Sequence, residues 1–138
     1  MTVGRVLRTG LDVDGRSAAI EDRVIDPRTL PSGRQLTELW ADGNAGTGPG
    51  GMFPGPGGVR YWLLTLPADD PGAPPQLHAT PTLDLGVLIA GRLRLILEDG
   101  SSTELAPGDA LVQTGTAHAW HNPGPADAVL AVVVLGAA

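Results

Sequence analysis

Two histidines and one aspartate, His78, Asp84 and His118, are the side chains of this sequence best suited to chemistry. An imidazole changes its charge near neutral pH, and a neighbouring carboxylate sets its tautomer and basicity. Two histidines and a carboxylate are also the ligand set of many non-haem iron sites. These residue types therefore predict either a metal site or an acid–base site. In the acid–base site, His118 or His78 is the base and Asp84 is the carboxylate that orients it.

The segment that leads to Asp84 alternates between polar and apolar residues. Alternate residues of a strand face opposite sides of a sheet, and one face here carries His78, Thr80, Thr82 and Asp84. Beyond the carboxylate the same face becomes apolar, as Gly86, Leu88 and Ala90. Asp84 is then buried, and a buried carboxylate needs a partner, a metal or a raised pKa. The pattern favours a barrel with a polar-lined cavity; the other interpretation is an edge strand with a solvated polar face.

Short strands must position these side chains. The 138 residues include 20 Gly and 13 Pro, as many turns between short strands require. Asp99-Gly100 is a hairpin turn signal, and no segment has a helical period. We therefore expect one all-β domain, residues 1–138, built as a sandwich or a closed barrel. The predicted strands are Val3–Thr9, Arg16–Glu21, Arg34–Trp40, Val59–Leu66, Leu83–Ile89, Leu93–Glu98, Thr103–Leu105, Ala110–Gln113, His118–His121 and Val129–Leu135.

Aromatic residues are scarce, so the three tryptophans are informative. Trp120 shares its strand face with His118, and Trp62 shares its face with Arg60. We predict that Trp40, Arg60, Trp62, Thr80 and Trp120 bind a small-molecule substrate, because aromatic walls with a few polar groups are typical of such pockets. The alternatives are core packing or a dimer contact for each tryptophan, and a surface position for Arg60, which could otherwise bind a carboxylate or enolate oxygen.

The stretch from Asp42 to Gly58 is rich in Gly and Pro and almost free of charge. It is longer than a simple connection between strands. It is interpreted either as a lid over a pocket or as a surface insertion.

The charge and composition exclude several classes of function. The net charge is −6 and there is no basic run, so the attraction on which nucleic-acid binding rests is missing. The chain has no cysteine, which excludes thiolate chemistry. The first residues lack the apolar core of a signal peptide, and the longest apolar run, from Ala128 to Leu135, is too short to span a bilayer. We expect a cytoplasmic protein with neither a membrane nor a nucleic-acid partner.

Two motifs in this sequence resemble those of the cupin family. His78, Thr80, Asp84 and Gly91 have the spacing of the first cupin motif. The second motif is matched by Pro107-Gly108-Asp109 and by His118 with Asn122 four residues later. The resemblance covers about residues 60–135 and implies a single-domain cupin, a jelly-roll β-barrel.

The resemblance also bears on a cofactor. In metal-binding cupins, two His and a Glu of the first motif and the His of the second hold the metal. Here Thr80 replaces one His and Asp84 replaces the Glu. The remaining set, His78, Asp84 and His118, implies either no cofactor or a single divalent transition metal (Fe, Ni, Zn or Mn).

The resemblance implies an enzyme of natural-product biosynthesis, among them polyketide cyclases and dehydratases. Acid–base chemistry in the barrel would serve dehydration, cyclisation, isomerisation or decarboxylation, which share proton abstraction next to a carbonyl. The alternatives are a metal-dependent oxygenase and a non-catalytic cupin that binds a small ligand.

The C-terminal strand predicts self-association. No residue from Val129 to Leu135 is polar, and a strand that is apolar on both faces needs cover on both sides. A homodimer is therefore expected.

Overall fold

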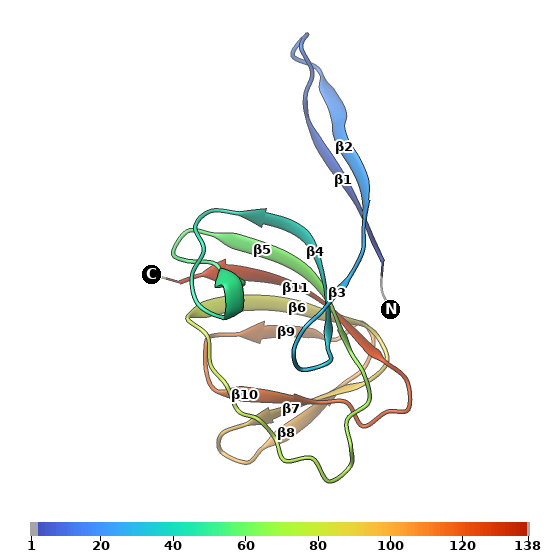
Figure 1. Ribbon diagram of the computed structural model, residues 1–138, viewed down its shortest axis with the longest axis vertical. Coiled ribbons are helices and arrows are strands. Elements are labelled where there is room, and N and C mark those ends of the chain that lie inside the picture. The colour runs from blue at the N-terminus through green and yellow to red at the C-terminus, as the bar shows by residue number, and fades with distance from the viewer. Residues whose placement is uncertain (1–2, 138) are drawn as a thin grey trace.

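The computed structural model describes residues 3–137, which form eleven β-strands and one short 3-10 turn (Figure 1). Nearly all regular structure is therefore strand, as predicted. The strands are β1 Gly4–Leu11, β2 Ser17–Ile25, β3 Arg28–Thr29, β4 Gln35–Asp42, β5 Val59–Leu66, β6 Thr82–Ala90, β7 Leu93–Leu97, β8 Ser102–Leu105, β9 Ala110–Gln113, β10 His118–His121 and β11 Ala128–Gly136.

Two antiparallel sheets form the body of the molecule. The larger has the order β3-β4-β5-β11-β6-β9 and the smaller has the order β10-β7-β8. One apolar cluster joins them, with Leu36, Trp62 and Leu130 from the larger sheet and Leu93 and Leu105 from the smaller. Since alternate residues of each strand enter this space, the sheets close around a common interior. The prediction of an all-β jelly-roll fold is confirmed.

The predicted strands agree closely with the structure. Each of the ten overlaps an observed strand, and the two-residue β3 is an addition within the described residues. The hairpin predicted at Asp99-Gly100 joins β7 to β8, which pair in antiparallel register. Gly100 has φ 88°, the left-handed conformation that such a turn needs.

Gly91 marks the passage of the chain from the larger sheet to the smaller one. Its φ is 75°, and a Cβ atom placed there would lie 2.5 Å from the carbonyl oxygen of Asp127. Backbone conformation and close approach both therefore require glycine. This explains in physical terms the glycine of the first motif.

The N-terminal hairpin of β1 and β2 extends away from the two sheets (Figure 1). Its base lies against β4 of the larger sheet. Within residues 3–137 no helix is long and apolar enough to cross a membrane.

Candidate functional site

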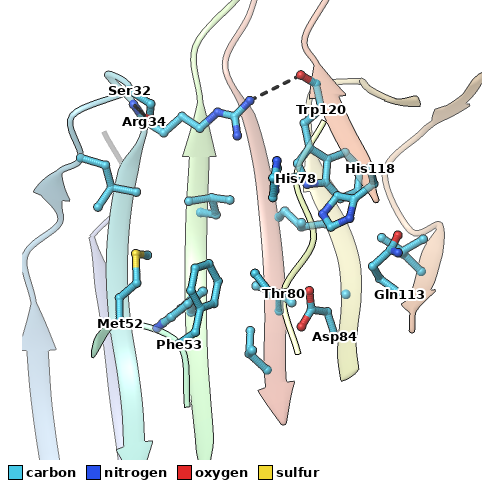
Figure 2. A pocket seen from close by; sticks show the side chains of 18 residues that line it. Ser32, Arg34, Met52, Phe53, His78, Thr80, Asp84, Gln113, His118 and Trp120 are labelled. Atoms are coloured by element: carbon cyan, nitrogen blue, oxygen red, sulfur yellow. Dashed lines mark hydrogen bonds between the residues drawn. The ribbon is translucent and has the colours of Figure 1, made fainter. Parts of the chain in front are cut away.

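A cavity of about 210 Å³ lies between the two sheets (Figure 2). Much of its wall is apolar, with Leu30, Met52, Phe53, Trp62, Leu64 and Leu130. Its polar side chains include those of Ser32, Arg34, His78, Thr80, Asp84, Gln113 and His118. An apolar enclosure with a few converging polar groups is the usual form of a small-molecule site.

Backbone pairing brings His78 and His118 together. The N–H of each residue donates a 2.9 Å hydrogen bond to the carbonyl oxygen of the other. Their imidazole rings lie 4.5 Å apart between centroids. The ring of Trp120 meets His118 edge to face at 5.9 Å. The predicted convergence of His78 and His118 is thus present in the structure.

Backbone carbonyl groups fix the tautomer of both imidazoles. Nδ1 of His118 lies 2.8 Å from the carbonyl oxygen of Thr116, and Nδ1 of His78 lies 3.2 Å from that of Gln76. A carbonyl oxygen only accepts hydrogen bonds, so each Nδ1 carries the proton. In the neutral imidazole Nε2 then keeps its lone pair, as a general base requires.

The two histidines differ in exposure. His78 is exposed at the mouth of the cavity, whereas His118 is only 4% exposed. Burial lowers the pKa of His118 below its ordinary value, although its hydrogen bond to Thr116 acts in the opposite direction. His118 is therefore neutral at neutral pH, with Nε2 free to accept a proton.

A chain of hydroxyl groups leads to Asp84. Oγ1 of Thr82 donates a 2.8 Å hydrogen bond to Oδ1 of Asp84, and Oγ1 of Thr80 lies 2.7 Å from that of Thr82. Thr82 has only one hydroxyl proton, so Thr80 is the donor in the second bond. Burial raises the pKa of Asp84, against the opposing effect of the Thr82 hydroxyl and of both histidines.

Among the described residues no hydrogen bond joins Asp84 to His78 or His118, so the orienting role of Asp84 stays a prediction. The carboxylate bonds to the hydroxyl of Thr82, and the imidazoles are oriented by the carbonyl groups of Thr116 and Gln76.

Three of the five predicted substrate-binding residues line the cavity, namely Trp62, Thr80 and Trp120. Trp40 does not, because a bulge in β4 pairs it with Tyr61 on the outer face. There its ring stacks with the guanidinium of Arg8, 5.5 Å away. Arg60 is buried, but it donates to the carbonyl oxygens of Asp42 and Val59 and is not part of the cavity lining.

The 42–58 loop supplies part of the cavity wall. Met52 and Phe53 face the interior (Figure 2), and Phe53 packs edge to face on Trp62 at 5.7 Å. A short turn at Pro49–Gly51 and a bridge between Ala45 and Pro54 give the loop defined structure. The loop therefore covers part of the pocket, and whether it moves as a lid stays a prediction.

Two functional candidates were missed from the sequence, Gln113 and Arg34. Gln113 is buried and donates to the carbonyl and hydroxyl oxygens of Thr116, the residue that orients His118. It lies opposite Asp84 in the register of β6 and β9, which local sequence does not reveal. Arg34 precedes Leu36 by two residues, so alternation along the strand places both side chains on the same face. This shared face with a core leucine was the signal in the sequence that could have identified Arg34.

The described residues as arranged do not fit a metal site. Within residues 3–137, no group of three or more His, Cys, Asp or Glu side chains could hold a metal ion. Thr80 contributes a hydroxyl already bonded to Thr82, and the Asp84 carboxylate is held by the same residue. Ligation by His78, Asp84 and His118 would use Oδ2 of Asp84, because Oδ1 accepts the hydrogen bond from Thr82.

The sequence is similar to one protein family and to several known proteins. A family model described as "Cupin domain" matches residues 62–134, more than half of the chain. The oryzines biosynthesis cluster protein J of Aspergillus oryzae is 43% identical over 72 residues, 52% of this chain and 37% of that protein. The cupin-domain-containing oxidoreductase fogC of Aspergillus ruber is 42% identical over 52 residues, 38% of this chain and 26% of that protein. The matched stretch thus spans only 37% and 26% of the length of these two relatives.

Solved structures share the architecture. The cupin domain of Schizosaccharomyces pombe Cnp3 has a TM-score of 0.63 at 10% identity, over 96% of this chain and 87% of that one. A likeness at this low sequence identity shows a shared fold and does not extend to function.

Proposed function

The chain belongs to the cupin family, and we propose that it is a small-molecule enzyme of secondary metabolism that performs acid–base chemistry in the barrel cavity. The observation that carries the proposal is His118, a buried imidazole whose Nδ1 lies 2.8 Å from the carbonyl oxygen of Thr116, an arrangement that leaves Nε2 as the acceptor. Relatives named as biosynthesis-cluster proteins support a role in making small molecules.

The first step is proton abstraction from a carbon next to a carbonyl group. Nε2 of His118 takes the proton, and the electron pair of the C–H bond moves to the carbonyl oxygen. The new imidazolium then returns the proton either to a leaving hydroxyl, which departs as water, or to another carbon. Dehydration and isomerisation both follow from these steps, and cyclisation uses the same enolate as its nucleophile. Decarboxylation of a 3-keto acid instead forms the enolate by loss of CO₂, and the enolate carbon then takes a proton from solvent.

The hydroxyl chain can stabilise the developing negative charge. When Asp84 is protonated, its proton can be donated to Thr82, Thr82 can donate to Thr80, and Thr80 then has a proton for the substrate oxygen. Burial of Asp84 favours this protonated form. A donor aimed at an oxygen that becomes charged is a common source of rate enhancement in a site shielded from water.

Hydrogen–deuterium exchange tests the proposal. The protein is incubated in D₂O with a panel of small ketones, 3-keto acids and 3-hydroxy carbonyl compounds, and loss of C–H signals is followed by NMR. Exchange above the uncatalysed rate is expected for at least one class, and His118→Gln is expected to lower it by about 10²–10⁴-fold because the base is gone.

The third histidine provides a matched control. His121 lies outside the cavity lining, 3.9 Å from Asp69, so His121→Gln should retain the exchange rate. Unchanged exchange in a folded His118→Gln variant would contradict the assigned base. Binding of panel compounds without any exchange would instead favour a ligand-binding cupin.

A second candidate function, a metal-dependent oxygenase, is favoured by the relatives whose names describe oxidoreductases. Elemental analysis of protein purified without chelator separates it from the first. Stoichiometric Fe, Ni, Zn or Mn that is lost in His118→Gln would favour the oxygenase.

A further inference from the structure

We propose that Arg34 binds an anionic oxygen of the substrate, most simply a carboxylate, so that the cavity takes small anionic carbonyl compounds. The inference rests on the proposed acid–base function and names the substrate class of the same site.

The guanidinium of Arg34 has unused hydrogen-bonding capacity. It carries five N–H donors, yet across residues 3–137 it makes one hydrogen bond, 3.4 Å long, to the carbonyl oxygen of Trp120. It forms no ion pair with a described carboxylate. A half-buried cation that forms no ion pair is costly, and a ligand carboxylate can accept two parallel N–H bonds from it.

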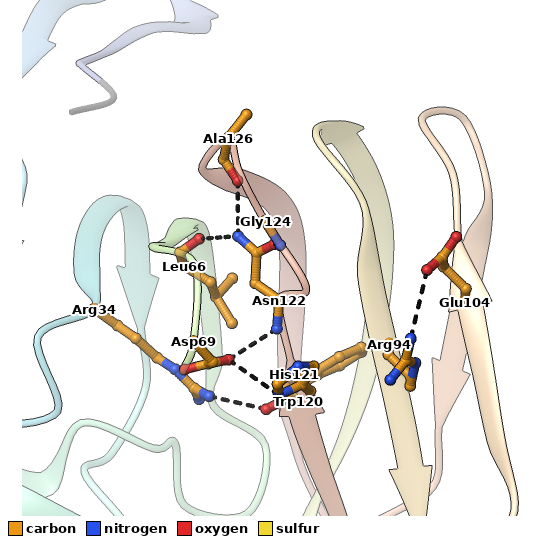
Figure 3. Close-up of polar contacts among 10 residues, drawn as sticks. All are labelled: Arg34, Leu66, Asp69, Arg94, Glu104, Trp120, His121, Asn122, Gly124 and Ala126. Carbon is orange, nitrogen blue, oxygen red and sulfur yellow. Dashed lines mark hydrogen bonds and ion pairs between the residues drawn. The ribbon is translucent and has the colours of Figure 1, made fainter. Parts of the chain in front are cut away.

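The neighbouring carboxylate, Asp69, is engaged elsewhere (Figure 3). Its Oδ2 accepts a 2.8 Å hydrogen bond from the backbone N–H of Asn122 and lies 3.9 Å from Nδ1 of His121. Asp69 therefore stabilises the turn after β10 and leaves the Arg34 donors open. Burial lowers the pKa of Arg34, against the opposing charge of Asp69, but a guanidinium remains protonated at neutral pH.

Arg34 stands where a ligand would enter. Together with His78 it lines both the inner cavity and the groove that adjoins it. Figure 2 shows Arg34 close to His78 and Trp120, whereas Thr80 and Asp84 lie further along the cavity. An anion held at Arg34 would thus place the rest of the molecule beside the two imidazoles.

The charge of the cavity suits an anion. Arg34 is the cation of the lining, His118 is neutral, and burial holds Asp84 toward its protonated form. Arg34 therefore places a positive charge at the mouth of the cavity in a chain whose net charge is −6. A cation at the entrance attracts a small anion to this place.

The cavity also limits the size of the ligand. Its volume of about 210 Å³ is below the range of roughly 300–1,000 Å³ that drug-sized ligands occupy. Trp62 lines the same space with a buried indole N–H that has no partner in the described part of the chain.

Binding of matched acids and esters tests the proposal without requiring catalysis. The probes are acetoacetate, 2-oxobutanoate and benzoylacetate, each beside its methyl ester, followed through the three tryptophan indole signals by ¹H–¹⁵N NMR. At least one acid should bind roughly 10–100-fold more tightly than its ester, as a charged hydrogen-bonded pair implies. The signals of Trp62 and Trp120 should move, and that of Trp40, outside the cavity, should not.

Arg34→Gln should reduce binding of the acid to the level of the ester and leave the ester within twofold of its original affinity. Arg16→Gln removes the same charge from an exposed position in the N-terminal hairpin and should change neither. The proposal is overturned if no acid binds more tightly than its ester, or if a folded Arg34→Gln variant binds the acid as the parent protein does. Arg34-dependent binding without deuterium exchange would retain this inference while rejecting the proposed chemistry.

Discussion

Asn122 shows what a single side chain contributes to this barrel. It is fully buried, and its Nδ2 donates to the carbonyl oxygens of Leu66 and Ala126 at 2.8 and 2.9 Å. Its Oδ1 accepts a 2.7 Å hydrogen bond from the N–H of Gly124. The residue that completes the second motif therefore joins the end of β5 to the turn before β11 (Figure 3). Its role is structural.

We predict that Asn122→Ala lowers the free energy of unfolding by about 3 kcal/mol, because it leaves buried backbone groups without partners. Asn44→Ala, the same change at an exposed position, should cost less than about 0.5 kcal/mol. Urea denaturation of both variants measures the difference. Equal midpoints would show that the Asn122 amide is dispensable.

Some residues of the site could be predicted from the sequence. Strict alternation before Asp84 placed His78 and Thr80 on its face, and the structure has all three lining the cavity. Arg34 was harder to find, because one residue at the start of a strand has no periodicity of its own. Its position beside Trp120 depends on pairing between residues 86 apart in the chain.

At the level of elements, the strands were predictable and their irregularities were not. Trp40 would face the interior by simple alternation, but the bulge between Glu38 and Trp40 reverses its face. A bulge adds one unpaired residue, so every side chain beyond it changes sides. β3 escaped prediction because Arg28–Thr29 is too short to show a period.

The 42–58 loop shows a second limit of local sequence. Its Gly and Pro content correctly indicates irregular backbone, but composition does not say where the loop packs. In the structure Met52 and Phe53 close over the cavity, and Gly55 lies against Gly136 at the end of β11. These contacts join segments far apart in the chain, so they follow from the tertiary fold.

At the scale of the whole molecule, the outer face of the larger sheet is apolar and exposed. Tyr61, Leu85, Val87 and Val112 are 39–65% exposed. Tyr61 and Leu85 both pair with Val133, and Leu85 also pairs with Val112, so these side chains are neighbours on one surface. The shallow groove between them has no charged lining residue. Contiguous apolar surface of this kind is uncommon on monomers.

We propose that a second copy of the chain covers this face. Two chains of net charge −6 repel each other, so an uncharged patch is the surface where they approach best, and a two-fold axis makes such a patch self-complementary. Light scattering after size exclusion should show a dimer, and Val112→Glu a monomer. Leu77→Glu, at an exposed residue outside the groove, should remain dimeric. A monomeric parent protein would contradict the proposal.

The proposed chemistry depends most on the protonation state of His118, which a ¹⁵N NMR titration of the imidazoles measures directly. With three histidines in the chain, His78→Gln and His121→Gln variants assign the remaining signal. Burial disfavours the imidazolium, so the pKa of His118 should lie below its ordinary value of 6.5. Because the unfolded chain binds this proton more readily than the folded chain, the free energy of unfolding should decrease as the pH falls below 6.5. The neutral form should carry its proton on Nδ1. Titration at or above 6.5, or a proton on Nε2, would contradict the assignment of His118 as the base.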